Sequence, residues 1–92
     1  MSGYTFFTDP GHGWLRVQLD ELDGFEPSAY SYLDDTYAYL EEDCDVLGWL
    51  DHHGVNSSAF WNGDYWANLR TVHADGDSFI RSLASFPGKA SA

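Results

Sequence analysis

The sequence predicts a small α+β domain in which a short antiparallel sheet is covered on one face by two or three short helices. Three observations lead to this class. The chain has 92 residues, which suits a single domain over residues 1–92. Hydrophobic residues make up 43% and aromatic residues 17%, so a core is available and an acidic disordered chain is excluded. Apolar residues alternate in some segments and recur at helical spacing in others.

The first predicted hairpin lies near residues 4–18. Residues 4–8 are rich in strand formers, and residues 14–18 alternate apolar with polar side chains. The segment between them, residues 9–13, reads Asp-Pro-Gly-His-Gly, and proline and glycine favour turns. We therefore expect two strands joined by a loop longer than two residues.

The second predicted hairpin lies near residues 30–40, with Asp34 and Asp35 at its turn. Tight pairing then places Leu33 opposite Thr36. Because side chains alternate along a strand, four tyrosines share one face: Tyr30, Tyr32, Tyr37 and Tyr39. This face is either half of the core, which we favour, or an interface rimmed by acids, because tyrosine is enriched at interfaces.

Three further segments have helical spacing of their apolar residues. The first covers residues 19–25 and stops at Gly24. The second covers residues 43–53, with Asp43 as its cap and Gly54 after its end. The third starts at residue 77 or 78 and carries one apolar stripe, made of Phe79, Ile80, Leu83 and Phe86. Residues 65–72 favour a strand, and residues 55–63 are ambiguous.

The strongest signal is the distribution of charge. Fifteen acids and four bases give a net charge of −11. Residues 1–51 contain twelve acids and one base, Arg16, so their net charge is 1 − 12 = −11, whereas residues 52–92 contain three of each and are neutral. Such segregation costs stability through self-repulsion but attracts basic partners. We favour an acidic docking surface over a merely solvated one.

The expected compartment is a reducing one. Cys44 is the single cysteine, which excludes an intramolecular disulfide and fits a cytoplasmic location. The N-terminus lacks a signal-peptide pattern, and no stretch approaches the roughly 18 apolar residues of a membrane helix. We expect a monomer that does not bind membranes.

Several residues could serve in catalysis or metal binding, but each also has a simpler structural interpretation. His12 lies between two glycines, and we expect a turn residue rather than a base. Cys44 has acidic neighbours, which disfavour the thiolate, so we expect a small buried helix residue. His52, His53 and His73 could join the acids around a metal, but adjacent helical histidines diverge by about 100°. We expect no metal, no cofactor and no enzymatic activity.

Direct binding to nucleic acid is disfavoured, because it depends on lysine and arginine meeting phosphates. The same excess of negative charge suggests instead that the protein imitates nucleic acid. About 30 Å of duplex DNA carries roughly 18 phosphate charges, and a domain of similar length with about a dozen carboxylates on one side can occupy a DNA-binding groove.

Four motifs resemble a family of small proteins of phages and other mobile elements: FFTDPGHGWLRV at residues 6–17, YSY at 30–32, YLEEDCD at 39–45 and SFIRS at 78–82. They span most of the chain. Acidic proteins of such elements include anti-CRISPR and anti-restriction proteins that imitate DNA. The resemblance therefore implies an inhibitor of host defence, by analogy of class.

Our leading hypothesis is an anti-CRISPR type of inhibitor that acts in a bacterial cytoplasm. As a DNA mimic, it would occupy the Lys/Arg-lined DNA site of a CRISPR effector or restriction enzyme. The predicted contact acids are Asp20, Glu21, Asp23, Glu26, Asp34, Asp35, Glu41, Glu42, Asp43 and Asp45. Two alternatives stay open. One is a regulatory interaction module that uses the four tyrosines, and the other is a metal or thiol enzyme.

Overall fold

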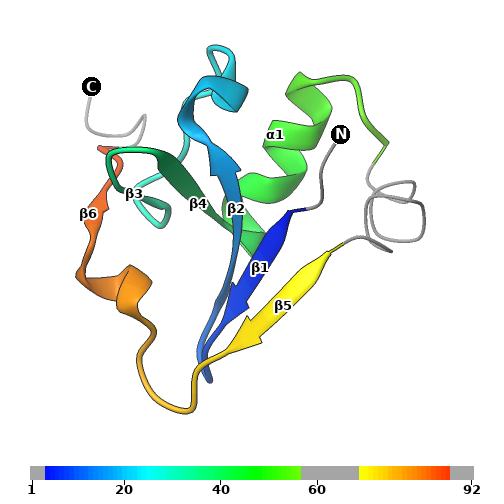
Figure 1. The fold of residues 1–92 in the computed structure, drawn as a ribbon. Helices are drawn as coiled ribbons and strands as arrows, with labels where there is room; N and C mark the ends of the chain where they lie inside the picture. The colour runs from blue at the N-terminus through cyan, green and yellow to red at the C-terminus, as the bar shows by residue number, and fades with distance from the viewer. Residues whose placement is uncertain (1–3, 57–68, 88–92) are drawn as a thin grey trace.

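Six strands form one mixed β-sheet in the order β5-β1-β2-β4-β3-β6 (Figure 1). The structure is a computed structural model, and it describes residues 4–56 and 69–87. The strands are β1 (Thr5–Thr8), β2 (Gly13–Gln18), β3 (Tyr32–Leu33), β4 (Tyr37–Glu41), β5 (Arg70–His73) and β6 (Ala84–Ser85). The α+β class is confirmed. The sheet is not purely antiparallel, however, because β5 pairs with β1 in parallel.

The first hairpin is confirmed. Strands β1 and β2 pair antiparallel, with Phe6 opposite Leu15. The turn closes where the amide of Asp9 donates to the carbonyl of His12 over 2.9 Å. The Asp9 carboxylate in turn accepts the amides of Gly11 and His12, each at 3.0 Å. An aspartate that holds its own turn in this way is typical of such loops.

The second hairpin forms, but its predicted register is wrong by two residues. Leu33 pairs with Ala38 and Tyr32 with Tyr39. The turn is wider than predicted because the Asp34 carboxylate accepts the amides of Thr36 and Tyr37, at 2.9 and 2.7 Å. A shift of two residues keeps every side chain on its predicted face.

One continuous helix follows β4. It begins as the π-helical segment η2 (Glu42–Val46) and continues as α1 (Leu47–His52). The predicted helix at 43–53 is thus confirmed, and Gly54 follows it at a φ of 72°. Its cap is Glu41 rather than Asp43, since the Glu41 side chain accepts the first free amides.

The predicted helix at 19–25 is only one 3-10 turn, η1 (Leu19–Leu22). It ends at Asp23, which has a left-handed backbone with a φ of 49°. None of the helices within the described residues is long and apolar enough to cross a membrane.

The predicted C-terminal helix is wrong. Ser78 precedes a single 3-10 turn, η3 (Phe79–Ser82), after which the chain extends into β6 and pairs with β3. The predicted strand at 65–72 appears as β5, which begins at Arg70, and its residues 65–68 lie outside the described ones. Within the described residues, the number of helices is therefore smaller than predicted.

Both faces of the sheet are covered, which corrects the prediction of helices on one face only. On the first face, Leu15 and Val17 pack with Trp49 and Leu50 of α1, and residues of η1 pack against the same cluster. Trp14 points to the opposite face, because neighbouring strand residues alternate, and it packs with two residues from other segments, Tyr39 and Ile80. The connection between β5 and β6 contains η3 (Figure 1), and Ile80 of η3 packs on this second face.

Candidate acidic binding surface

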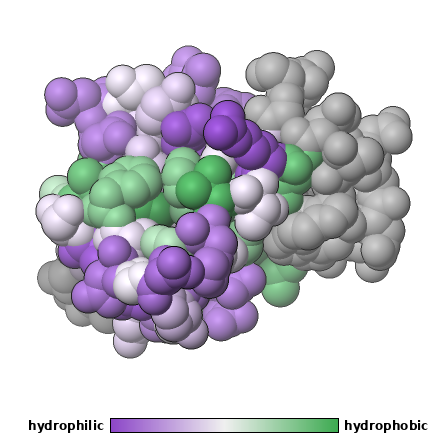
Figure 2. Space-filling model, turned by 60° about the horizontal axis from the view of Figure 1, so that its bottom comes forward, coloured by the Kyte–Doolittle hydropathy of each residue, from purple (hydrophilic) through white to green (hydrophobic). Residues whose placement is uncertain are grey.

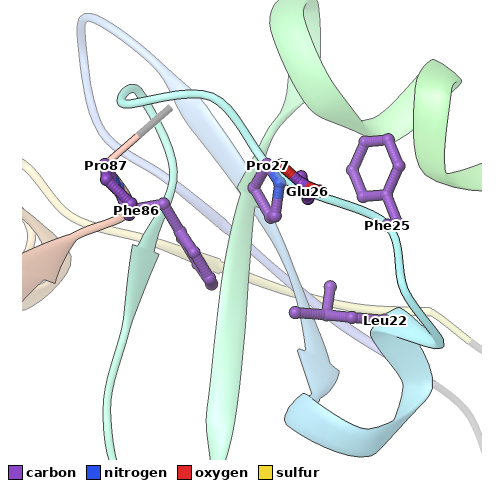
Figure 3. A pocket seen from close by; sticks show the side chains of 6 residues that line it. All are labelled: Leu22, Phe25, Glu26, Pro27, Phe86 and Pro87. Atoms are coloured by element: carbon purple, nitrogen blue, oxygen red, sulfur yellow. The ribbon is translucent and has the colours of Figure 1, made fainter. Parts of the chain in front are cut away.

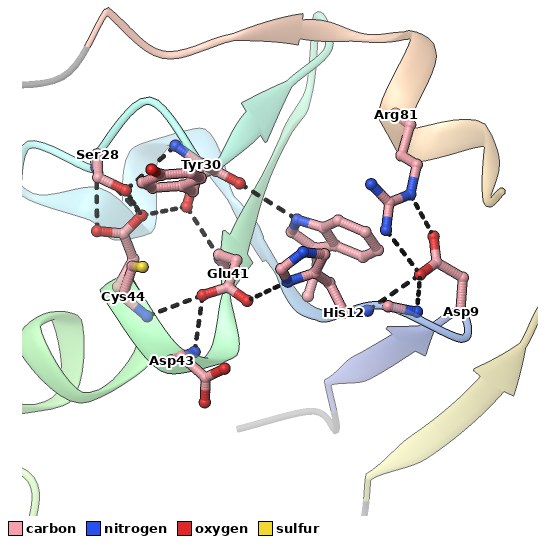
Figure 4. A network of polar contacts seen from close by, with 12 residues as sticks. Asp9, His12, Ser28, Tyr30, Glu41, Asp43, Cys44 and Arg81 are labelled. Atoms are coloured by element: carbon pink, nitrogen blue, oxygen red, sulfur yellow. Dashed lines mark hydrogen bonds and ion pairs between the residues drawn. The ribbon is translucent and has the colours of Figure 1, made fainter.

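Asp9 is one of the acids that the fold uses internally. Its side chain is 1% exposed and accepts two bonds from Arg81, at 2.7 Å from Nε and 3.0 Å from Nη2 (Figure 4). The Arg81 hydrogen bonds, followed by the amide of Ser78, hold the pKa of this carboxyl well below its usual range despite burial. Arg81 also lies 5.3 Å from the centre of the Trp14 ring. This pair fixes η3 across the second face of the sheet.

Glu41 is also buried, and its carboxylate joins three segments. One oxygen accepts the amides of Asp43 and Cys44, at 2.8 and 2.9 Å, and the other lies 3.1 Å from Nδ1 of His12 (Figure 4). His12 is therefore a turn residue tied to a carboxylate, with a side chain that is 46% exposed.

Asp45 is buried beside this group and belongs to the same network. It accepts the amide of Ser28 at 3.0 Å and the hydroxyls of Ser28 and Ser31. The Ser31 hydroxyl also accepts the amide of Glu41 at 2.9 Å. Glu41 and Asp45 thus hold the start of η2 against the chain before β3, and we leave them out of the proposed surface.

Two of the predicted contact acids are half-buried, and their carboxylates accept hydrogen bonds from other residues of the chain. Glu21 accepts the Tyr4 hydroxyl at 3.1 Å and the Gln18 amide at 3.0 Å. Asp34 holds the β3–β4 turn and also accepts the Tyr39 hydroxyl at 2.8 Å. Burial acts to raise the pKa of Asp34, but these hydrogen bonds and the charge of Arg16 together lower it.

Of the six remaining predicted acids, five lie at the two ends of β4. We call Asp20, Asp23 and Asp35 the η1-end acids; all three are exposed, and the amide of Leu19 bonds to the carbonyl of Thr36 there at 3.0 Å. We call Glu42 and Asp43 the η2-end acids. Burial raises the pKa of Glu42, and the charges of Asp43 and Glu41 raise it further.

The ten predicted acids therefore do not form one continuous face. Four steps along β4 separate its ends by about 13 Å, at roughly 3.3 Å per residue. Glu26 is exposed on the connection between η1 and β3. Asp51, which is not among the predicted contact acids, is exposed on α1.

Few cations compensate these exposed acids. The Arg16 guanidinium stacks over the Tyr37 ring at 4.3 Å and lies 5.5 Å from Phe7, and Arg81 is paired with Asp9. Arg70 is exposed on β5. Lys89 lies outside the described residues. The two arginines with internal contacts sit on the second face of the sheet, and the Arg16 charge acts on Asp34, the neighbour of Asp35.

The four predicted contact tyrosines occupy different environments. Tyr39 is buried at 2% exposure, whereas Tyr30 is 65% exposed. Tyr32 and Tyr37 are half-buried and pack against the cluster of Trp14, Tyr39 and Ile80. Burial and the Asp34 carboxylate raise the pKa of Tyr39 to about 12. The shared face is mainly core, and Tyr30 lies outside the hairpin strands.

Cys44 is exposed in η2, not buried as predicted. Desolvation raises the pKa of its thiol, and the hydrogen bond and charge of Glu41 raise it further, so the reactive thiolate is disfavoured.

His52 and His53 lie at the end of α1 and contact the backbone of η1. Each lies with its Nε2 2.7 Å from a carbonyl oxygen, that of Asp23 and that of Glu21 respectively. His73 lies far along the chain, with Nδ1 2.8 Å from the Thr8 hydroxyl. Among the described residues, no group of three or more histidines, cysteines and acids is arranged to hold a metal ion.

A shallow pocket of about 190 Å³ lies beside η1. Figure 3 shows its lining, which consists of Leu22, Phe25, Glu26, Pro27, Phe86 and Pro87. Binding sites for small molecules combine apolar walls with several convergent polar groups. Only one ionisable side chain, Glu26, lines this pocket, so it offers little for specific recognition.

The division of the acids into internal and exposed groups was not predicted from the sequence. The serine partners of Asp45 lie 14 and 17 residues away, and the histidine partner of Glu41 lies 29 residues away, so local charge gave no sign of these contacts. The one feature of the sequence that could have indicated these internal contacts was the presence of serine and histidine in the neighbouring loops. Comparison with known proteins found no matching family profile, no matching curated protein and no matching solved structure.

Proposed function

We propose that this protein is a non-enzymatic inhibitor of a host system that targets DNA, and that it imitates the charge of DNA. Its exposed carboxylates would bind the Lys/Arg-lined DNA site of a CRISPR effector or restriction enzyme and exclude the DNA. The observation that carries this proposal is the imbalance that remains after internal pairing. The η1-end acids and Asp43 stay exposed, while Arg81 is neutralised by Asp9 and Arg16 is stacked on aromatic rings.

The charge density supports contact with part of a DNA groove rather than all of it. The longest extent of the protein is 33 Å, and that length of duplex carries roughly 19 phosphate charges at one per 1.7 Å. The described part of residues 1–51 exposes six acids, namely Asp20, Asp23, Glu26, Asp35, Asp43 and Asp51. This is about a third of the DNA charge, so the partner site would be a short basic patch.

The η1-end acids are the contact that we favour, because three exposed carboxylates gather around one turn and one hairpin tip. Neither Asp20 nor Asp35 takes part in the hydrogen bonds described above. Their replacement should therefore change the surface charge and leave the fold intact.

The experiment compares two variants with the same change in net charge. One is Asp20→Asn/Asp35→Asn, and its matched control is Asp75→Asn/Asp77→Asn in the neutral half of the chain. Each variant is immobilised and used to capture DNA-binding proteins from a bacterial lysate, and duplex DNA is added as competitor. We expect the first variant to lose binding about tenfold or more, the control to bind like wild type, and DNA to displace the partner.

The outcome separates this proposal from its alternatives. Equal loss in both variants would indicate an effect of total charge only, and partner binding that DNA does not displace would refute mimicry. A Tyr30→Ala variant tests the interaction-module alternative, since Tyr30 is the exposed member of the four tyrosines. Loss of binding there, with no effect of the acid changes, would favour that alternative.

A further inference from the structure

The outer edge of β5 has the features of a pairing surface. Among the described residues, β5 is the last strand on its side of the sheet, and all four of its residues are exposed. An edge strand presents unpaired amides and carbonyls to any strand that can align with it. This edge belongs to the neutral part of the chain, away from the η1-end acids.

The hydrogen bonds to β1 identify the groups that point outward. The amides of Arg70 and Ala74 donate to the carbonyls of Tyr4 and Thr8, at 3.0 and 2.8 Å. Because backbone groups alternate in direction along a strand, the amides and carbonyls of Thr71 and His73 point away from β1.

An apolar patch lies next to this edge. Val72 is 37% exposed and stands opposite Phe7 in the register of β5 and β1. The Phe7 ring lies 5.4 Å from the ring of Phe79, which is 51% exposed. Figure 2 shows a band of apolar surface, bordered by hydrophilic side chains, on the side of the molecule where β5 and η3 lie.

We propose that β5 pairs antiparallel with β5 of a second copy of this chain, and so forms a two-fold symmetric dimer with a continuous sheet. Alignment about Val72 places Thr71 opposite His73 of the second copy, where the two residues exchange both backbone hydrogen bonds. The two Val72 residues then face each other as a close pair, with Cα atoms about 4.5 Å apart.

Charge complementarity favours a second copy over another occupant. Arg70 stands at the start of β5, and two exposed acids, Asp75 and Asp77, follow its end. A two-fold axis at Val72 brings Arg70 of each copy beside the acidic loop of the other, as a self-complementary interface requires. The described residues 69–87 carry two arginines and two aspartates, so the charge next to this edge is balanced, whereas the net charge of −11 on each whole chain opposes association.

The first test is the mass of the full chain in solution, measured by sedimentation equilibrium from about 1 to about 500 µM. We expect the mass to rise from 10.3 kDa toward twice that value, with a dissociation constant on the order of tens of micromolar, because a four-residue strand gives a small interface. A mass that stays at the monomer value over this range would overturn the proposal, even if an extended peptide of another protein bound the edge.

Variants then assign the dimer to this edge. Thr71→Pro removes an outward amide, which an edge strand tolerates, and should weaken dimerisation at least tenfold; Thr71→Ser retains the amide and should not. Dimerisation that survives Thr71→Pro in a folded chain would exclude this edge. Should Thr71→Pro fail to fold, the charge pair decides: Arg70→Glu should weaken the dimer and added Asp75→Lys should restore it. Absence of that rescue would then overturn the proposal.

Discussion

Replacing Asp9 with asparagine should destabilise the protein strongly, although both side chains have the same shape. The substitution removes the charge that pairs with Arg81 and leaves an amide group where several donors converge. Breaking a buried, hydrogen-bonded charge typically costs about 3 kcal/mol. The total free energy of unfolding of a chain of this size is roughly 5–14 kcal/mol, and a loss of 3 kcal/mol lowers Tm by roughly 12–24 °C.

Asp77→Asn is the matched control for this prediction. Asp77 also contacts Arg81, at 3.7 Å, but its side chain is 89% exposed. An exposed pair of this kind contributes under about 1 kcal/mol. Unfolding in urea, followed by tryptophan fluorescence because Arg81 packs on Trp14, should therefore separate the two variants clearly.

Acid titration provides a second check on the same residue. The folded-state pKa of Asp9 is lowered by Arg81, so its contribution to stability is fully present above the unfolded pKa near 4 and is lost as the pH falls toward the folded pKa. The difference in stability between wild type and Asp9→Asn should thus shrink below about pH 4. If Asp9→Asn is as stable as Asp77→Asn, or if the difference does not change in acid, the assignment of Asp9 as a structural anchor is refuted.

Two further predictions concern Gly13, at the start of β2, and Cys44, in η2. Gly13→Ala should lower the free energy of unfolding by about 1–3 kcal/mol, because the added Cβ would lie 2.7 Å from the Phe6 ring. Gly76→Ala is the control in the same urea assay and should not destabilise the protein, because the space around Gly76 is open. Cys44 should react with iodoacetamide more slowly than a free thiol at pH 8, because desolvation and Glu41 raise its pKa; faster alkylation than in a model peptide would contradict this.

The first hairpin was predictable because its determinants are local. The Asp-Pro-Gly-His-Gly turn and the alternation of residues 14–18 act within one short segment. The second hairpin was predictable in its faces but not in its register, since the Asp34 carboxylate widens the turn through the amides of Thr36 and Tyr37. The hydrogen bonds of this one side chain therefore set the register of the hairpin.

The C-terminal segment could not be predicted from its apolar stripe. Its apolar residues do have helical spacing, but the Asp9 carboxylate, about 70 positions away, accepts hydrogen bonds from the amide of Ser78 and from the Arg81 side chain. Strand β3 then pairs with the following residues. Tertiary contacts of this range override local helical preference. The same holds for Asp45, whose serine partners removed it from the predicted surface.

The central claim, that exposed carboxylates imitate DNA at a basic site, is tested most directly by the salt dependence of binding to the captured partner. Measured from about 50 to about 200 mM salt, the dissociation constant should rise at least tenfold. It should rise less steeply for Asp20→Asn/Asp35→Asn than for Asp75→Asn/Asp77→Asn. A dissociation constant that stays constant over this range would contradict the account.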